Sequence, residues 1–548
     1  MEAARRASSA ISGKNSIPTT QAMDPTLPSE VRLANLGYTQ ELTRTFSLLG
    51  MIGFSFSIVT CWTALGGVLT VGITSGGPPV MIWSWLAICL FTLTIAYSFA
   101  EMCSAYPVAG GQYSWVAILA PRGIARGMSY MTGWFMITGI VAMGAVNNFI
   151  AANFVLGMAQ LNRPGYVIER WHTVLLTYLI AVLAAVSNLT VSRFFDKLST
   201  GILVWNVGSF VVVCVTILAM NDNKQSASFV FTDFQNDTGF ASPGMAVMIG
   251  LLQSFFGMCC YDAPTHMTEE MLNPSVEAPR AIVMSVYLGA VTGFCFLVSA
   301  FFCVSDLESV AGTATGVPLI QIFADSTGNV GAATFLAALI AVIVLVCANS
   351  LMAEGSRSLY AFARDHGLPF SGLFSSVDKR RSVPVYSIIL CMVVQMALNS
   401  IYFASYEGFS TVISIATFGF YLSYGMPLLA RLWSRMSGQH KEIAGSAYSL
   451  GRMGPWLNGA GLLFLAFAWV DFNFPQVGPV DGNNMNYCSA AFGVIGLIAL
   501  VTWFGGAHKT FTGPQVSIQE GEVVPLANGE TAEVAAEKNA GIQKEKAR

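Results

Sequence analysis

The most restrictive feature of this sequence is a series of twelve runs, mostly of about 20 or more predominantly apolar residues, between residues 46 and 504. A helix needs roughly 20 such residues to cross the hydrocarbon core of a bilayer. Because lipid offers no partner to backbone N–H and C=O groups, such runs can cross it only as helices. The sequence therefore predicts an all-α polytopic membrane protein with twelve transmembrane helices (spans 1–12), at 46–71, 79–103, 127–160, 173–191, 200–220, 243–264, 281–304, 330–353, 384–404, 411–432, 456–472 and 487–504.

Composition supports this prediction and excludes several classes of protein. Only 10% of the residues are charged and 54% are hydrophobic, whereas an ordinary soluble domain carries about 25% charged residues. A net charge of −3 gives no reason to expect a nucleic-acid partner. Many of the eleven cysteines lie singly inside apolar runs, and the five histidines are far apart, so we expect no disulfide framework, no metal site and no cofactor.

The distribution of Lys and Arg predicts the orientation, because cytoplasmic loops are enriched in these residues. With both termini inside, the cytoplasmic loops hold fourteen of them and the outer loops only three. An outer loop also carries a glycosylation sequon at Asn236. Residues 1–45 and 506–548 read as disordered cytoplasmic tails that flank a twelve-helix membrane domain at 46–505, and no cleaved signal peptide is evident.

Two of the runs are interrupted in a way that is typical of transporters, whose irregular backbone at membrane depth must line a cavity. Run 46–71 is dense in glycines and small hydroxyl residues, among them Gly53 and Ser57, and run 243–264 combines Gly257, Asp262 and Pro264. Each is the first of five spans, which suits two inverted five-span repeats plus two extra spans. Small residues that serve only close helix packing are the alternative.

Asp262 is the only carboxylate well inside any of the first ten runs. A buried intramembrane charge is costly and indicates function by default, here the binding of a solute or a proton. The alternative is local, because Asp262 could cap the second half of a broken helix that has Pro264 in its first turn. The two roles are compatible.

Further polar and aromatic side chains inside the runs are candidates for the same site. Asn148 and Asn349 could bind solute, or they could hydrogen-bond neighbouring helices. Aromatic residues flank the proposed breaks and could form a box around an ammonium group, with plain packing as the alternative. These aromatic residues are Trp62, Phe255, Phe256 and Tyr261.

At these positions the sequence resembles the fungal amino acid/choline permeases, including GABA and choline permeases, of the amino acid–polyamine–organocation superfamily. The resemblance covers nearly all of residues 45–504. It is carried by the stretches at 74–78 (TSGGP), 101–115 (EMCSAYPVAGGQYSW), 261–270 (YDAPTHMTEE), 360–369 (YAFARDHGLP) and 483–487 (NNMNY).

The resemblance implies the leucine-transporter-type fold, with the substrate held between the broken spans 1 and 6 and lined by spans 3, 8 and 10. It also implies proton-driven uptake by alternating access of an amino acid, GABA, choline or another quaternary amine. The candidate substrate-binding residues are then Gly53, Ser57, Trp62, Asn148, Phe255, Phe256, Gly257, Tyr261, Asp262 and Asn349. The plasma membrane is the expected residence, with the vacuolar membrane as the alternative.

Three charged residues lie on the predicted cytoplasmic side: Glu101, Arg122 and Arg364. Ion pairs among such loops could latch an inner gate, and solvated loop charges are the alternative. A membrane-embedded enzyme would need a paired nucleophile and base, or metal ligands, and span 6 has one acid and no partner histidine in another span. Two further functions stay open, namely a nutrient sensor on a transporter scaffold and a carrier of an unusual amino compound linked to a biosynthetic pathway.

Overall fold

The computed structural model describes residues 29–514 except 60, 68, 192–193, 405, 439–445 and 483. The described part is almost entirely helical, and eleven of its helical segments are long and apolar enough to cross a membrane. They are α4 with α5 (Leu48–Val59 and Cys61–Gly67), α7 (Gly77–Ala105), α9 (Ala125–Asn162), α10 (Arg170–Thr190), α11 (Phe195–Met220), α15 (Pro274–Phe302), α18 (Val330–Arg364), α20 (Val385–Ala404), α21 (Tyr406–Met436), α22 (Gly454–Asp471) and the helical stretch Cys488–Thr510, which begins with α23 (Cys488–Thr502).

The one predicted run not among these, span 6 at 243–264, is a shorter helix followed by irregular backbone. Helix α13 (Pro243–Gly257) ends inside the run, and the chain becomes helical again only at α14 (Ala263–His266). The remaining short elements are α3 (Ser29–Asn35), α6 (Leu69–Thr74), α8 (Gln112–Leu119), α12 (Ala227–Phe231), η2 (Thr268–Glu270), α16 (Leu307–Ala311), α17 (Pro318–Thr327), α19 (Ser371–Phe374), η3 (Gly451–Met453), η4 (Trp503–Ala507) and α24 (His508–Thr510), with one antiparallel pair of strands, β1 (Ser75–Gly76) and β2 (Gln235–Asn236).

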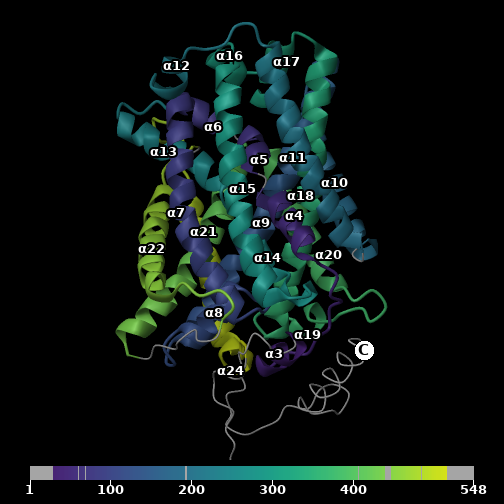
Figure 1. Ribbon diagram of the computed structural model, residues 1–548, viewed down its shortest axis with the longest axis vertical. Coiled ribbons are helices and arrows are strands. Elements are labelled where there is room, and N and C mark those ends of the chain that lie inside the picture. The colour runs from purple at the N-terminus through teal and green to yellow at the C-terminus, as the bar shows by residue number, and fades with distance from the viewer. Residues whose placement is uncertain are drawn as a thin grey trace, which may run out of the picture.

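The long helices run roughly along the long axis of the molecule (Figure 1). Helix α7 packs against α15, α9 against α18, and α10 against α20. These are spans 2 and 7, 3 and 8, and 4 and 9, so equivalent members of two five-span halves lie in contact. Helix α9 also packs extensively against α21, and α4 against α11.

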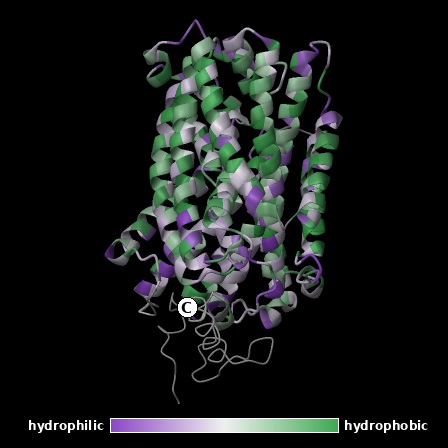
Figure 2. Cartoon of the chain, turned by 45° about the vertical axis from the view of Figure 1, so that its right-hand side comes forward, coloured by the Kyte–Doolittle hydropathy of each residue, from purple (hydrophilic) through white to green (hydrophobic). Residues whose placement is uncertain are grey.

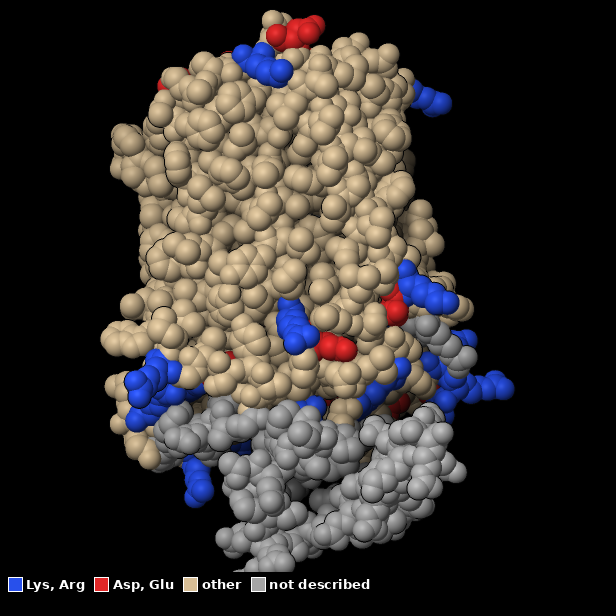
Figure 3. All heavy atoms as spheres, viewed as in Figure 1, with Lys and Arg blue, Asp and Glu red and all other residues tan. Residues whose placement is uncertain are grey.

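The outer surface of the bundle is that of a protein solvated by lipid. Apolar residues cover most of the length of the helices (Figure 2), and large side chains such as Val204, Leu463 and Leu497 are exposed. Lys and Arg gather at the lower end, which carries α8, α19 and α24, while the side of the bundle is nearly free of charge in this view (Figure 3). The chain is a multi-pass membrane protein, as predicted.

Helix ends follow local sequence signals. Proline lies in the first turn of α7, α13, α14, α15, α17 and α22, where its missing N–H costs nothing. The side chain of Asn329 accepts a hydrogen bond of 3.0 Å from the backbone N–H of Ala332 and so caps α18. Before α7, Gly76 has a φ of 100°, which only glycine adopts without strain.

The expectation of a disordered N-terminal tail is wrong for residues 29–45. After α3, the buried Leu36 and Tyr38 pack under the bundle, and the Tyr38 hydroxyl donates to Asp365 at 2.9 Å. The C-terminal expectation also changes for residues 506–514, because Phe511 is buried against Tyr130 and Phe362. Residues 1–28 and 515–548, the rest of the two expected tails, lie outside the described residues.

Helices α9 and α21 cross with their backbones in close contact. A Cβ atom on Gly139 would lie 2.7 Å from the backbone nitrogen of Phe420, and one on Gly419 would lie 2.7 Å from the Cα of Gly139. The two backbones therefore touch directly, which is the close approach that small residues permit between membrane helices. Span 3 is held against span 10 by this contact.

We predict that Gly139→Ala lowers the melting temperature of the purified protein by several degrees relative to Gly208→Ala. Overpacking of this kind costs about 1–3 kcal/mol, and the clashing atoms are backbone, which cannot rotate away. Gly208 lies exposed on α11 with nothing within 4 Å of its Cβ position, so its replacement shares the gain in helix propensity without the clash. Equal melting temperatures in a thermal-shift assay would contradict this account of the crossing.

Candidate functional site

The irregular segment of span 6 is the centre of the candidate site. Residues 258–262 connect α13 to α14 without helical structure, and Cys260 has a φ of 63°. Gly257 ends the first half-helix and Pro264 lies in the first turn of the second. The predicted interruption of span 6 is confirmed. In span 1, α4 and α5 lie on either side of residue 60, which falls outside the described residues.

A cavity lies beside this segment, between spans 1, 3, 6 and 8. It is small: the volume open to the centre of a water-sized sphere is about 20 Å³. That is room for a water molecule or two and not for an amino acid, so this conformation is closed around the site. The lining residues are Ile58, Val59, Thr63, Ala64, Met143, Asn147, Ile150, Phe256, Cys259, Cys260, Val344, Cys347 and Leu351, none of them charged and none from span 10.

Of the expected aromatic box, Phe256 alone lines this cavity. Trp62 lies between Phe210 and Phe296, and its indole N–H donates to Asn206 at 2.7 Å. Phe255 points toward spans 10 and 11, where it contacts Tyr421, Phe464 and Phe472, and Tyr261 packs against Phe99 and Tyr424. In this conformation the four rings do not surround one space.

The expected polar residues serve mainly helix contacts. The Asn148 amide donates to the side-chain oxygen of Gln395 at 3.0 Å. The backbone oxygen and the side-chain oxygen of Asn349 both accept from the Asn188 amide. Asn147, which precedes Asn148 and was not among the candidate residues, lines the cavity. Its amide donates to the backbone oxygen of Val344 at 3.0 Å.

The selected small residues of spans 1 and 6 lie at helix contacts. Ser57 lies 3.1 Å from the Ser350 hydroxyl. A Cβ on Gly53 would meet the backbone of Ser199, and one on Gly257 would meet Trp85 and Leu65, so both glycines allow close packing.

The structure does not show the expected cap at Asp262, and the expected role of this residue in binding a solute or a proton stays a prediction. It occupies the position before α14, but its side chain makes no capping hydrogen bond. It also does not line the cavity. Its fully buried carboxylate instead accepts short hydrogen bonds from the Gln112 amide and the Tyr424 hydroxyl, and one oxygen lies 3.1 Å from Nε2 of His266.

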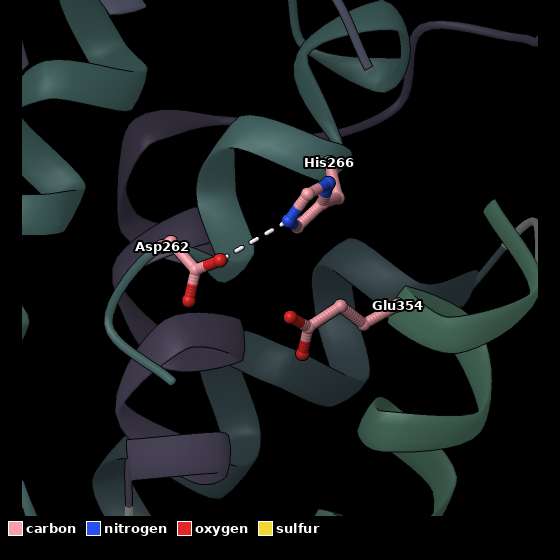
Figure 4. Close-up of side chains that lie close together, drawn as sticks. All are labelled: Asp262, His266 and Glu354. Atoms are coloured by element: carbon pink, nitrogen blue, oxygen red, sulfur yellow. Dashed lines mark hydrogen bonds and ion pairs between the residues drawn. The ribbon is translucent and has the colours of Figure 1, made fainter. Parts of the chain in front are cut away.

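A second buried carboxylate faces this pair. Glu354 of α18 points toward Asp262 and His266 (Figure 4). One carboxylate oxygen from each of the two acids and one ring nitrogen of His266 all lie within 4.8 Å of one another. All three side chains are buried. Glu354 was not among the candidate residues because the predicted apolar run ends at Ala353, whereas α18 continues to Arg364. His266 was not among them because it lies two residues beyond the predicted end of span 6.

Ion pairs close the lower end of the bundle, and two of the three expected gating residues belong to them. Arg431 donates to Glu101 at 2.5 Å, and Arg364 donates to both oxygens of Glu269 at 2.8 and 3.0 Å. Arg122, the third, is exposed in the turn between α8 and α9. A further pair, which the sequence did not indicate, joins Arg357 of α18 to Glu270 at 2.8 Å.

The N-terminal segment 38–46 reinforces this closure. The side-chain amide of Gln40 donates to the backbone oxygen of Glu269, and the backbone N–H groups of Thr45 and Phe46 donate to that of Glu270. The Arg364 guanidinium lies over the Tyr38 ring, 4.1 Å from its centroid. Burial raises the pKa of the neighbouring Asp365 carboxyl, and the Arg364 charge opposes that shift.

The sequon at Asn236 lies at the upper end in a folded turn. Its amide donates to the backbone oxygen of Phe240 at 2.8 Å, and its side-chain oxygen accepts from the hydroxyl of Thr238, which is buried. An attached sugar would require this turn to open. Glycosylation of Asn236 therefore stays a prediction, and the structure offers it no support.

A helical bundle with an interrupted helix at a closed internal cavity, and with paired charges across one end, is the architecture of a solute carrier. The chain belongs to the amino acid permease family, whose model matches residues 46–500. That membership indicates a transporter.

Relatives of this chain carry consistent names. It is 61% identical over 441 residues to a Macrophomina phaseolina protein named as an amino acid/polyamine transporter, covering 80% of this chain and 97% of that one. It is 31% identical to a choline transporter of Saccharomyces cerevisiae, covering 86% and 83%. It is 30% identical to the amino-acid permease BAT1 of Arabidopsis thaliana, covering 90% and 98%.

We predict that the double variant Glu269→Gln/Arg364→Gln opens the lower end and exposes the cavity from that side. The ion pair is charge-assisted and worth about 1.5–3 kcal/mol, so its loss raises the open fraction by about tenfold or more. A membrane-impermeant maleimide is added from the lower side. Mass spectrometry then measures the rate at which it alkylates Cys259 and Cys260.

The matched control is Glu308→Gln, which neutralises an exposed carboxylate at the upper end. It should leave the alkylation rate unchanged. Replacing both partners avoids leaving one charge buried and unpaired, which would destabilise the fold for a separate reason. If the double variant reacts no faster than the control, the pair is not part of a gate.

Proposed function

We propose that this protein imports a small amino compound by alternating access, and that a proton gradient drives the uptake. The observation that carries the proposal is the closed cavity at the irregular segment of span 6, with buried titratable groups beside it and a sealed lower end. A cavity too small for substrate, held between two ends of which one is latched by ion pairs, fits the occluded stage of such a cycle.

The chemistry of the lining favours a substrate that carries a cationic nitrogen. The names of the relatives mention amino acids, polyamines and choline, all of which carry a cationic nitrogen. No lining side chain is charged, so the ammonium group would be held by the Phe256 ring, the Asn147 amide and the backbone of 258–262. A substrate carboxylate would need backbone N–H groups as partners, as at the end of a broken helix.

The lower end is proposed to face the cytoplasm. Lys and Arg gather there (Figure 3), as expected for cytoplasmic loops. The same proposal places the latched end inside and the paired strands β1 and β2 outside. The plasma membrane is the proposed residence, with the vacuolar membrane as the alternative.

We predict that tags at the two ends of the chain are both protected from protease in intact cells and both cleaved after permeabilisation. The physical reason is the fourteen-to-three distribution of Lys and Arg between the two sets of loops. Cleavage of the N-terminal tag in intact cells would show that the N-terminus lies outside and would contradict the predicted orientation. A tag of the same kind in the outer loop at 222–226, cleaved in intact cells, shows that the protease reaches the surface.

We predict that uptake of at least one member of a labelled panel of choline, GABA and amino acids exceeds background in cells that lack their own carriers. Collapse of the proton gradient by a protonophore should reduce that uptake several-fold, because accumulation has no other source of free energy in this scheme. Cells with empty vector are the control. Uptake that persists unchanged with the protonophore would leave facilitated diffusion or exchange as the mechanism.

A further inference from the structure

One face of α18 connects the cavity to the latched end of the molecule. Cys347 and Leu351 line the cavity, and Glu354 and Arg357 follow them at helical spacings of three and four residues, so the four side chains share a face. Arg357 already pairs with Glu270. Glu354 therefore lies between the site where a solute would bind and the ion pairs that close the lower end.

Glu354 is the exception among the buried charged groups along this face. It is fully buried, and neither of its carboxylate oxygens has a hydrogen-bond partner in the part of the chain that the structure describes. An ionised carboxylate in such surroundings is strongly disfavoured, and a group so placed neutralises instead. Its orientation toward Asp262 and His266 (Figure 4) gives it no donor of its own.

The Asp262–His266 pair, in contrast, is electrically complete. The Nδ1 atom of His266 lies 3.1 Å from the backbone oxygen of Ala109, which can only accept, so Nδ1 carries a hydrogen. One proton then lies between Nε2 and the Asp262 carboxylate, whichever atom holds it, and the pair is neutral in sum. Gln112 and Tyr424 supply the remaining donors to Asp262.

Since the pair is neutral, it offers Glu354 no net positive charge to balance an ionised carboxylate. We propose that Glu354 binds the coupling proton of the transport cycle, and that the Asp262–His266 pair is a fixed neighbour that keeps its own proton. This inference rests on the proposed function, of which it names the coupling site.

The proton balance of the cycle is simple. When the cavity opens to the outside, a hydronium ion protonates the Glu354 carboxylate and leaves water. The neutral acid is the form that tolerates the closed state. When the lower end opens, the acid gives its proton to cytoplasmic water and becomes a hydrated carboxylate again.

Few other groups can compete for this proton. The titratable groups that act on Glu354 or feel its charge are Asp262 and the thiols of Cys259, Cys260 and Cys391, with His266 beside Asp262. The sequences of α4 and α9, which pack against α18, contain no carboxylate, histidine or lysine. Thiols hold their protons more firmly than a carboxylic acid does, so the carboxylate is the group that can cycle.

The test compares the wild-type protein with Glu354→Gln, reconstituted into vesicles. Gln keeps the shape and remains neutral, as the protonated acid is. With labelled choline or GABA, whichever the wild type takes up, a gradient of one pH unit should drive accumulation of up to about tenfold for one proton per solute. The variant should show about onefold accumulation while still exchanging labelled for unlabelled solute at equal pH.

A measurement without substrate accompanies it. The infrared difference spectrum between wild type and Glu354→Gln should contain the carbonyl band of a protonated, buried carboxylic acid, which the difference between wild type and Glu308→Gln should lack. Asp262→Asn should keep that band. Glu308 is the matched control because it is exposed.

The outcomes separate this inference from the proposed function. A wild type that does not respond to the pH gradient, or that responds only to sodium, overturns proton coupling itself and Glu354 with it. A wild type that responds, with a Glu354→Gln variant that still accumulates solute against the gradient, overturns only the assignment to Glu354. Absence of the carboxylic-acid band from the wild-type difference spectrum also overturns that assignment.

Discussion

The rest of this structure depends on one constraint, which is that backbone polar groups inside a bilayer must find partners within the protein. Eleven long helical segments meet it within themselves. The segment 258–262 cannot, because it is not helical, so it must be buried among other helices or face an internal space. The bundle of spans 1, 3 and 8 around it, and the backbone contact of Gly139 with Gly419 that holds span 3 against span 10, provide that surrounding.

The same constraint governs how the buried carboxylates of spans 6 and 8, and that at the lower end of span 2, are neutralised. Glu101, Glu269 and Glu270 each face an arginine at the lower end, where a pair can exchange with water as the end opens. Asp262 and Glu354 lie closer to the cavity, where no arginine or lysine pairs with either of them in the described part of the chain. There the available neutralising partner is a proton, and His266 shares one with Asp262.

Much of the fold could be predicted from the sequence. Twelve apolar runs and a helix interrupted between Gly257 and Pro264 are properties of composition and of local backbone chemistry. The site was harder, because a helical residue and its neighbour point about 100° apart. Run boundaries alone could not choose between Asn147 and Asn148, and the structure assigns the cavity to Asn147. For the same reason the sequence could not show that Trp62 lies outside the cavity, with its indole directed toward span 5.

Hydropathy also left functional candidates just outside the predicted ends of the apolar runs. A window that rewards apolar residues ends where a charged residue first appears, so it ended span 8 at Ala353, one residue before Glu354. The helix continues because backbone hydrogen bonds do not depend on side-chain polarity, and α18 carries Glu354, Arg357 and Arg364 on to the lower end. In a membrane protein, the first charged residue beyond an apolar run is therefore a place to look for function.

That continuation gives α18 its mechanical importance. A rigid helix that lines the cavity at Cys347 and Leu351, and that holds the lower ion pair through Arg357, cannot move at one level without moving at the other. The second half of span 6 faces it along the same length, with Asp262 and His266 opposite Glu354 and with Glu270 opposite Arg357. Separation of these two elements would therefore break the ion pair and hydrate Glu354 in one step. Release of a proton and opening of the gate would then be a single event.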